Sequence, residues 1–559
     1  MTITSSKNNK ASIDLFLLFT AAFIIISAGI GLRDPWPADE PRYALVAKQM
    51  VESGQWFFPF RGDELYPDKP PLFMWVEAFF YWLTGSLRFA FLMPSLLAGL
   101  FTLGLTYDLG RRLWNHRIGI IAGWTLLATV QFTLQAKTAQ IDAMLCLWVT
   151  LALYGFCRHL LQGPDWRWYY LGFAAVGLGV ITKGVGIIAL LVFVPWFFAR
   201  QQQWRLLTAF PQKTFKWWIG PITMLGVISA WLLPMLILVH ISNDPALEAY
   251  RDNILFKQTG GRYAHSWGHI KPFWYFFVSV IPVFWLPLSL AFPWLIPAWW
   301  HRLQRKDARY LLLLGYALLA LLFFSFSAGK RGVYVLPLLP AVALASAALV
   351  PGLMKKVSLQ KTFWSVLALL STGLLLFFLY ATVVKPDIQT EVLQKYQLNP
   401  WGLILAIAVL GISWLFWGWK QRQRRGVIAL SGFFLSLWLI YGWYGYPTLN
   451  DGRSSRQLMA KVGQRLGPEG QLALVNWKEQ TLLMADRKAT TFGFTRPPET
   501  QLSDALQWVQ QPGKRFILLQ KPKSTRCIEF SPTDFLGRWH QRDWYLIDQQ
   551  AISSHCKIQ

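Results

Sequence analysis

Charged side chains are scarce in this chain of 559 residues: Asp, Glu, Lys and Arg make up 15% of it, whereas hydrophobic residues make up 54%. A soluble protein of this length would show charged helix faces at regular intervals, and this sequence lacks them. Apolar runs of about twenty residues recur instead, almost to residue 446. The main solvent of the chain is therefore a lipid bilayer.

Acidic residues are the scarcer charge, with 28 Asp and Glu against 54 Lys and Arg, which gives a formal net charge of +26. In a soluble protein this excess would suggest nucleic-acid binding. Here the basic residues lie between apolar runs, in the alternate short loops at 111–117, 200–216, 302–309, 355–361 and 420–425. That is the pattern of cytoplasmic loops in a multi-pass protein, so nucleic acid is not an expected partner.

A small-residue cleavage site is also missing after the first apolar run, Ile13 to Leu32, so this run is expected to stay as the first span. About thirteen spans are predicted, within a transmembrane domain over residues 1–446. Because the number of predicted spans is odd, the first loop, residues 33–87, and the C-terminal residues 447–559 are expected on the same, outer side of the membrane. That C-terminal segment reads as a small α/β domain, with strands at 471–475, 488–494 and 515–519 and helices at 456–466 and 503–510.

The first loop is too polar to lie in hydrocarbon. Asp39 to Glu52 carries apolar residues at helical spacing, and Pro70 to Gly85 is aromatic and apolar but too short to span a bilayer. Both segments are predicted to form helices that lie along the outer membrane surface. Together they would roof a cavity there.

Cysteine is rare as well, with four in the chain. Cys146 and Cys157 lie in an apolar run, whereas Cys527 and Cys556 lie in the C-terminal segment, which would meet oxidising conditions outside the cytoplasm. A Cys527 to Cys556 disulfide is predicted, and two unpaired thiols are the alternative.

Two stretches of the first loop carry reactive side chains. Asp39 and Glu40 fall at the start of the first predicted surface helix, where the alternative role of an Asp is simply to cap the helix. Further on, Asp68 and Lys69 stand directly before Pro70 and Pro71. Because prolines fix the backbone, a rigid Lys69 is suited to holding a phosphate, and binding of lipid headgroups is its alternative.

These residues carry a resemblance. Asp39-Glu40-x-Arg42-Tyr43, followed by Asp68-Lys69-Pro70, resembles the first-loop signature of the C-type membrane glycosyltransferases, in particular the lipid A aminoarabinose transferase branch, which is related to the protein O-mannosyltransferases. The resemblance implies an inner-membrane enzyme with many spans, two surface helices in its first loop and a C-terminal periplasmic domain. It also implies an active site on the periplasmic side and inversion at the anomeric carbon.

The resemblance also implies roles for individual residues. Asp39 would be the catalytic base, Lys69 and Arg42 would bind the donor phosphate, and Glu40 and Tyr43 would line the same cavity. A polyprenyl phosphate leaves as an anion without a nucleotide, and no Asp-x-Asp motif is found outside the membrane helices, so no cofactor is required. A divalent metal held by Asp68 and His265 remains open beside the alternative that the histidines of that loop are solvated.

Matches elsewhere in the chain add further candidates. Asp142, at the outer end of a span, resembles a second catalytic acid of the family, and its alternative is an ion pair with Lys137. Lys183 resembles a cavity position, and Arg262 would be a third phosphate contact. Lys330 and Tyr334 fall in a stretch similar to the family's Lys-x-x-x-Tyr-x-Leu-Pro segment, where Tyr334 is alternatively a residue of the interfacial aromatic belt.

The predicted function is therefore transfer of a sugar from a polyprenyl (undecaprenyl) phosphate donor to an envelope acceptor, most simply an aminoarabinose-like sugar to lipid A or lipopolysaccharide. Protein O-mannosylation, or another transfer to a cell-envelope glycan, is an alternative within the same fold. A lipid or sugar transporter or flippase is the alternative outside it, but inverted repeats and paired broken helices are not evident in the sequence. Membrane lipids, the donor and the acceptor are the expected partners.

Overall fold

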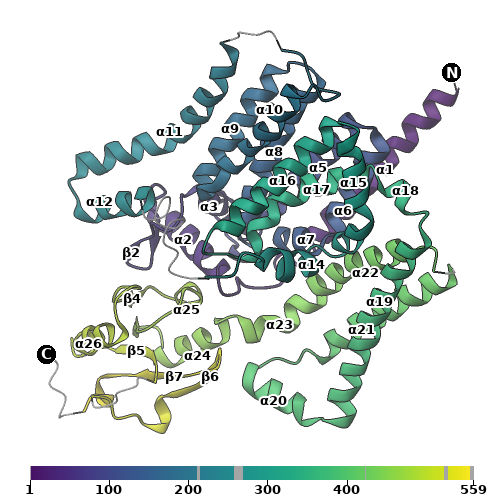
Figure 1. The fold of residues 1–559 in the computed structure, drawn as a ribbon. Coiled ribbons are helices and arrows are strands. Elements are labelled where there is room, and N and C mark those ends of the chain that lie inside the picture. Colours follow the sequence, from purple (N-terminus) through teal and green to yellow (C-terminus); the bar gives the residue numbers. More distant parts are fainter. Residues whose placement is uncertain (1, 211–214, 257–268, 422, 522–526, 554–559) are drawn as a thin grey trace.

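The computed structural model describes residues 2–210, 215–256, 269–421, 423–521 and 527–553, which are mostly helical (Figure 1). Within them, seven helices are long and apolar enough to cross a membrane, and the number rises to nine if each of two bent helix pairs is one span. The chain is thus a polytopic α-helical membrane protein, as predicted. The seven spans are α4 and α5 (Leu87–Ala90 and Met93–Leu113), α8 (Ile141–Gln162), α11 (Lys216–Ser242), α16 (Ala308–Phe326), α19 and η6 (Val357–Leu379 and Tyr380–Val384), α21 (Trp401–Lys420), and α22, η7 and α23 (Gly426–Ile440, Tyr441–Gly445 and Tyr446–Arg453).

The other predicted spans are short or broken in the structure. The pair α6 (His116–Ala128) and α7 (Val130–Ala136) bends by 73° at Thr129, whose backbone is extended. The hydroxyl of Thr129 donates to the carbonyl of Thr125, and the hydroxyl of Thr133 donates to that of Leu127, so the break leaves these carbonyls hydrogen-bonded. The second bent pair joins η3 and α14 (Phe276–Val280 and Ile281–Phe284) to η4 and α15 (Leu288–Ala291 and Phe292–Gln304) at an angle of 109°. The remaining apolar helices are α1 (Thr2–Ser27), α9 (Trp166–Lys183), η1 with α10 (Val185–Val192 and Phe193–Gln201), and η5 with α17 (Gly332–Leu338 and Leu339–Ala347).

Both helices expected in the first loop are present, as α2 (Glu40–Ser53) and α3 (Leu72–Thr84). Each ends where its sequence predicts, because Gly54 and Gly85 follow with positive φ angles that glycine adopts without strain. A two-stranded hairpin of β1 (Phe60–Arg61) and β2 (Glu64–Leu65) lies between them. On α3, Glu77 is fully buried. Burial, together with the charge of the nearby Glu40, raises the pKa of the Glu77 carboxyl well above its usual value.

Two neighbouring residues fasten the first loop to the rest of the chain. Arg33 is buried and forms a two-pronged ion pair with Glu40, whose second contact is 2.7 Å long. Asp34 is also fully buried and accepts hydrogen bonds from Arg88, Ser454 and Arg456. Burial alone would raise the pKa of Asp34, but the hydrogen bonds from Arg456 and Arg88 outweigh it and hold the pKa far below the usual value. Asp34 therefore ties the loop to both a membrane helix and the C-terminal segment.

The C-terminal segment forms a mixed five-stranded sheet in the order β4-β3-β5-β7-β6. Parallel pairing joins β3 to β4 and β5, and antiparallel pairing joins β7 to β5 and β6. Its elements are α24 (Arg456–Leu466), β3 (Gln471–Leu474), α25 (Glu479–Leu483), β4 (Ala489–Thr491), α26 (Pro498–Val509), β5 (Arg515–Gln520), β6 (Phe535–Trp539) and β7 (Arg542–Ile547). The predicted strands at 471–475, 488–494 and 515–519 coincide with β3, β4 and β5, whereas β6 and β7 were not predicted.

The two faces of this sheet have different neighbours. Ala473 and Ile517 pack with α26 on one face. Leu472 and Leu518, which alternate with them along β3 and β5, belong instead to a hydrophobic core shared with α2 and α3. Figure 1 shows the first loop between the membrane helices and the sheet. The sheet and the first loop thus form one packed unit, and the helix that leads into it runs from Gly426 to Arg453 across the predicted boundary at 446.

Of the four cysteines, Cys146 and Cys157 are buried free thiols. Cys527 is disulfide-bonded. Cys556, its predicted partner, lies outside the described residues, so the pairing stays a prediction.

The buried ion pair of Arg33 and Glu40 gives a test of this fold. Replacing Glu40 by Gln leaves the Arg33 guanidinium buried without a counter-charge, which we expect to lower the free energy of unfolding by about 3–5 kcal/mol. Thermal unfolding of the purified protein in detergent measures the change. The matched control is Glu52→Gln on the same helix, whose carboxylate is 55% exposed and lies 3.8 Å from Lys48, and which should alter stability by less than about 0.5 kcal/mol. Equal melting temperatures for the two variants would refute the structural role of Glu40.

Candidate active site

Asp39 occupies the position before the first residue of α2, but its side chain does not cap the helix. Its carboxylate is instead held by two guanidinium groups: Arg331 Nη2 donates to Asp39 Oδ2 at 3.1 Å, and Arg42 Nη1 lies 3.6 Å from Asp39 Oδ1. The alternative of simple helix capping is therefore wrong. Asp39, Arg42 and Arg331 form the centre of a charged group that we call the Asp39 cluster.

The C-terminal segment contributes to this cluster. Glu479, the first residue of α25, is 4% exposed and accepts a hydrogen bond of 2.8 Å from Arg42 Nε. Arg61 Nη1 lies 3.8 Å from the same Glu479 oxygen, and the Arg61 guanidinium stacks 3.8 Å from the centroid of the Phe494 ring. Arg42 thus bridges Asp39 of the first loop and Glu479, which lies 437 residues after Arg42 in the chain.

Lys69 and Asp68 lie at the edge of the Asp39 cluster. Arg61 Nη1 lies 3.9 Å from Asp68 Oδ2, and Lys69 Nζ donates to the backbone carbonyl of Asp68 at 2.7 Å. The sequence predicted that Asp39, Arg42 and Lys69 share one anion. Asp39 and Arg42 are in contact, and Lys69 is connected to them through Asp68, Arg61 and Glu479.

A second ion pair joins the ends of two membrane helices, α8 and α9. Lys183, the last residue of α9, contacts Asp142 in the first turn of α8 at 2.5 Å, and its Nζ lies 4.6 Å from the centroid of the Tyr334 ring. These three predicted residues are therefore together. Burial would lower the pKa of Arg331, but the carboxylates of Asp39 and Asp142 raise it above its usual value, so both acids lie close enough to act on this guanidinium.

The alternative of an ion pair between Asp142 and Lys137 is wrong. Lys137 is 2% exposed and donates to the backbone carbonyls of Ile25 and Ala28 at 2.9 and 2.6 Å. Those carbonyls end α1 and have no partner within that helix. Burial and the neighbouring Arg33 lower the pKa of Lys137 to about 7. Lys137 is a structural residue that caps the C-terminal end of the first helix.

Lys330 is engaged in a similar way. Its ammonium is 4% exposed and donates to the backbone carbonyls of Lys271 and Ser327 at 2.8 and 2.5 Å. This corrects the expectation that Lys330 faces the substrate, since a long buried side chain tied to two carbonyls holds the loop. Its neighbour Arg331 makes the contact with Asp39 instead.

Glu40 also serves the fold. Beside Arg33, its carboxylate accepts hydrogen bonds from the backbone nitrogens of Trp36 and Ala139 at 2.8 and 3.0 Å. These contacts give Glu40 a structural role, and its place in the substrate cavity stays a prediction. Tyr43 is 4% exposed and packs edge-to-face against Phe73, beneath the Asp39 cluster.

Two predicted residues, Arg262 and His265, lie outside the described residues. Within the described part of the chain, no group of three or more His, Cys, Asp or Glu is arranged to hold a metal ion. The predicted phosphate contact of Arg262 and the possible metal pair of Asp68 and His265 therefore stay predictions.

Taken together, the connected side chains are suited to an anionic ligand. The cations are Arg42, Arg61, Arg331, Lys183 and Lys69, and the carboxylates are Asp39, Asp142, Glu479 and Asp68. Guanidinium groups keep several N–H donors free when they pair with a carboxylate in this way. A phosphate could thus bind to guanidinium groups that are also paired with a carboxylate.

Sequence reasoning missed three members of this cluster, Arg61, Arg331 and Glu479. Arg331 is adjacent to Lys330 in the segment already singled out, and this adjacency was the only available signal. Arg61 and Glu479 carry no local motif, because their roles arise from the packing of the C-terminal segment against the first loop. Pattern matching within one segment could not find them.

The chain is similar in sequence to known glycosyltransferases. Residues 68–233 match the family described as dolichyl-phosphate-mannose-protein mannosyltransferase. The chain is 27% identical over 542 residues to an undecaprenyl phosphate-alpha-4-amino-4-deoxy-L-arabinose arabinosyl transferase of Pseudomonas aeruginosa, with 90% of this chain and 92% of that protein covered. A similarly named transferase of Sodalis glossinidius is 29% identical, with 76% of each chain covered.

Solved structures show the same fold. The crystal structure of ArnT from Cupriavidus metallidurans bound to undecaprenyl phosphate superposes with a TM-score of 0.73 at 19% identity, and covers 95% of this chain and 97% of that chain. An oligosaccharyltransferase from Archaeoglobus fulgidus matches with a TM-score of 0.50 at 12% identity, over 91% of this chain and 69% of that one.

In sequence and in fold this chain is thus similar to the C-type membrane glycosyltransferases. Within that superfamily it is similar to the aminoarabinose transferase branch, as its first-loop motif predicted.

The contact between Glu479 and Arg42 can be tested in a transfer assay. Glu479→Gln removes the charge that holds Arg42 against the C-terminal segment, and the loss of one charge-assisted hydrogen bond, about 1.5–3 kcal/mol, should lower kcat/KM by roughly tenfold or more. Glu469→Gln in the same segment is the control, since that residue is 75% exposed and pairs with Lys514 at the surface. Full activity of Glu479→Gln would exclude the C-terminal segment from the site.

Proposed function

We propose that this chain transfers an aminoarabinose-like sugar from a polyprenyl phosphate carrier, undecaprenyl phosphate in the bacterial case, to lipid A or another envelope acceptor. The observation that carries the proposal is the Asp39 cluster, in which a carboxylate lies between Arg42 and Arg331 at the end of the membrane helices. The names of the relatives from Pseudomonas aeruginosa and Sodalis glossinidius support the identity of carrier and sugar.

The reaction breaks the bond between the anomeric carbon and the carrier phosphate and forms a bond from that carbon to an acceptor oxygen. The carrier departs as a phosphate anion, so positive groups that are already in place lower the barrier. In the proposal Arg42 and Arg331 stabilise this anion, with Lys69 and Arg262 as further contacts. These groups need no metal ion to act, because each carries its own charge and donors.

Asp39 orients the acceptor or removes its proton. A hydroxyl acceptor requires a base, whereas a phosphate acceptor is already ionised at neutral pH and can attack directly. In either case attack from the face opposite the carrier inverts the anomeric carbon. Asp142, Lys183 and Tyr334 then form the wall for the sugar, where the aromatic ring offers a stacking surface.

The proposed topology has thirteen spans. The seven long helices and the two bent pairs supply nine, and α1, α9, η1 with α10, and η5 with α17 supply four more. In this arrangement the basic loops at 111–117, 200–216, 302–309, 355–361 and 420–425 face the cytoplasm. The first loop, the Asp39 cluster and residues 447–559 then lie on the periplasmic side of the inner membrane.

Protein O-mannosylation, or transfer to another envelope glycan, is the second candidate. It is favoured by the family match over residues 68–233, which carries the name of a protein mannosyltransferase. The match covers Lys69, Asp142 and Lys183 but ends before Arg331 and Glu479. Both reactions would use the same carrier phosphate, and they differ in sugar and acceptor.

Replacing Asp39 by Asn tests the mechanism. The amide cannot accept a proton or pair ionically with Arg42 and Arg331, so we expect transfer to fall by at least a hundredfold. Membrane insertion and abundance should stay unchanged, and both can be measured on the same membranes. Glu52→Gln, at the far end of α2, serves as the active control. Normal turnover by Asp39→Asn would remove this residue from the mechanism.

Single-cysteine labelling tests the sidedness. Lys514→Cys, where the native side chain is 69% exposed, should react with a membrane-impermeant maleimide on intact spheroplasts. Arg305→Cys, in an exposed basic loop, should react only after the membrane is opened. The parent protein gives the background. The reverse pattern would invert the proposed orientation.

A further inference from the structure

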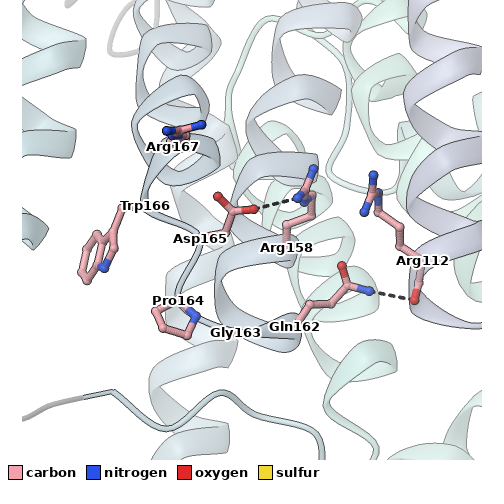
Figure 2. A pocket seen from close by; sticks show the side chains of 8 residues that line it. All are labelled: Arg112, Arg158, Gln162, Gly163, Pro164, Asp165, Trp166 and Arg167. Atoms are coloured by element: carbon pink, nitrogen blue, oxygen red, sulfur yellow. Dashed lines mark hydrogen bonds and ion pairs between the residues drawn. The ribbon is translucent and has the colours of Figure 1, made fainter.

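A second basic site lies at the opposite end of α8 and α9 from the ion pair of Asp142 and Lys183. It is a cavity of about 630 Å³ lined by Arg112, Arg158, Gln162, Gly163, Pro164, Asp165, Trp166 and Arg167 (Figure 2). These residues come from the end of α5, the end of α8 and the start of α9. Three arginines and one carboxylate give the lining an excess of positive charge.

The position of this cavity follows from helix length. Asp142 lies in the first turn of α8 and Gln162 at its last residue, and the 22 residues of α8 span about 33 Å at 1.5 Å per residue. That length is close to the thickness of a bilayer's hydrocarbon core, about 30 Å. α9 returns in the opposite direction, from Trp166 to Lys183 at the Asp39 side. The cavity therefore lies at the other membrane surface and cannot belong to the transfer site.

Fixed partners hold two of the arginines in place. Arg158 Nη2 donates to Asp165 Oδ2 at 2.7 Å, and Arg158 Nη1 donates to the hydroxyl of Tyr154 at 3.3 Å. The Tyr154 hydroxyl in turn donates to Asp108, which also accepts from Arg112 Nε at 2.5 Å. Figure 2 shows the Arg158 to Asp165 contact and the hydrogen bond from Gln162 to the Arg112 carbonyl. The side chains are thus positioned before any ligand arrives.

The cavity retains unused donors. Arg112 contacts Asp108 through its Nε, and a guanidinium group has four further N–H donors on its terminal nitrogens. Arg167 is exposed and makes no ion pair with any described residue. The carboxylate of Asp165 accepts from Arg158 and does not cap the start of α9. The backbone N–H groups in the first turn of α9 therefore favour an anion nearby.

We propose that this cavity binds a phosphate anion at the membrane surface opposite the transfer site. Guanidinium forks match the oxygens of a phosphate group, and Trp166 and Pro164 offer an apolar wall of the kind that accompanies a lipid headgroup. The phosphate of an anionic lipid and free inorganic phosphate share this chemistry. The proposal is independent of the sugar-transfer reaction, because it concerns only binding.

Lipid retention tests the first source. The purified full chain is placed in nanodiscs of phosphatidylcholine and phosphatidylglycerol in equal parts, extracted, and the lipids that remain bound are counted by native mass spectrometry. We expect phosphatidylglycerol to be retained at least fivefold over phosphatidylcholine. Arg158→Gln and Arg167→Gln should abolish this preference. Arg200→Gln, which replaces an exposed arginine near the end of α10 outside the cavity, should keep it.

Inorganic phosphate tests the second source. If the preference for phosphatidylglycerol is absent but millimolar phosphate raises the melting temperature of the parent and of Arg200→Gln, and not of Arg158→Gln or Arg167→Gln, the cavity binds free phosphate. Both results support an anion site. The proposal is overturned if neither phosphatidylglycerol retention nor stabilisation by phosphate differs between the parent and the two cavity variants. Because each readout is binding, a failure of the sugar-transfer proposal would leave this test intact.

Discussion

The buried charges of Arg33 and Asp34 hold the rest of the structure in place. Each is removed from water and has several partners. Arg33 pairs with Glu40 and donates to the backbone carbonyl of Lys137, and Asp34 accepts hydrogen bonds from Arg88, Ser454 and Arg456. A buried charge is costly unless it is fully paired, so these contacts allow few alternative arrangements. The first loop therefore has one fixed position against the helices, and α2 carries Asp39 to a defined place.

Within that frame the carboxylates divide into two kinds. Asp34 and Glu40 are surrounded by donors of the protein and serve the fold. Asp39 and Asp142 are each paired with basic side chains at the ends of helices, where a ligand's phosphate can compete for the same guanidinium and ammonium groups. The cations follow the same division, since Lys137 and Lys330 bind backbone carbonyls, whereas Arg42 and Arg331 bind side chains. Neither proximity in sequence nor burial separates the two kinds, since Asp142 and Glu40 are both 5% exposed; their partners do.

Much of the architecture could be read from the sequence. The apolar runs gave the polytopic fold, and the apolar spacing with Gly54 and Gly85 gave the two helices of the first loop. The hairpin of β6 and β7 was missed because its turn, His540 and Gln541, has positive φ angles without the Asn or Gly that usually signals it. Breaks such as Thr129 were also invisible, since nothing in composition distinguishes a kinked apolar run from a straight one. The first-loop motif located Asp39 and Arg42, but Glu479 depends on tertiary packing alone.

The contact of Arg42 and Arg61 with Glu479 has a consequence for how the protein is made. A ribosome would release the first loop early, while the glutamate that neutralises its two arginines is still hundreds of residues from synthesis. Until the last segment has folded, those arginines lack the carboxylate that they share in the finished protein. The nascent chain thus has an incomplete Asp39 cluster, and in the proposed topology the final stage of translocation is also the step that completes it.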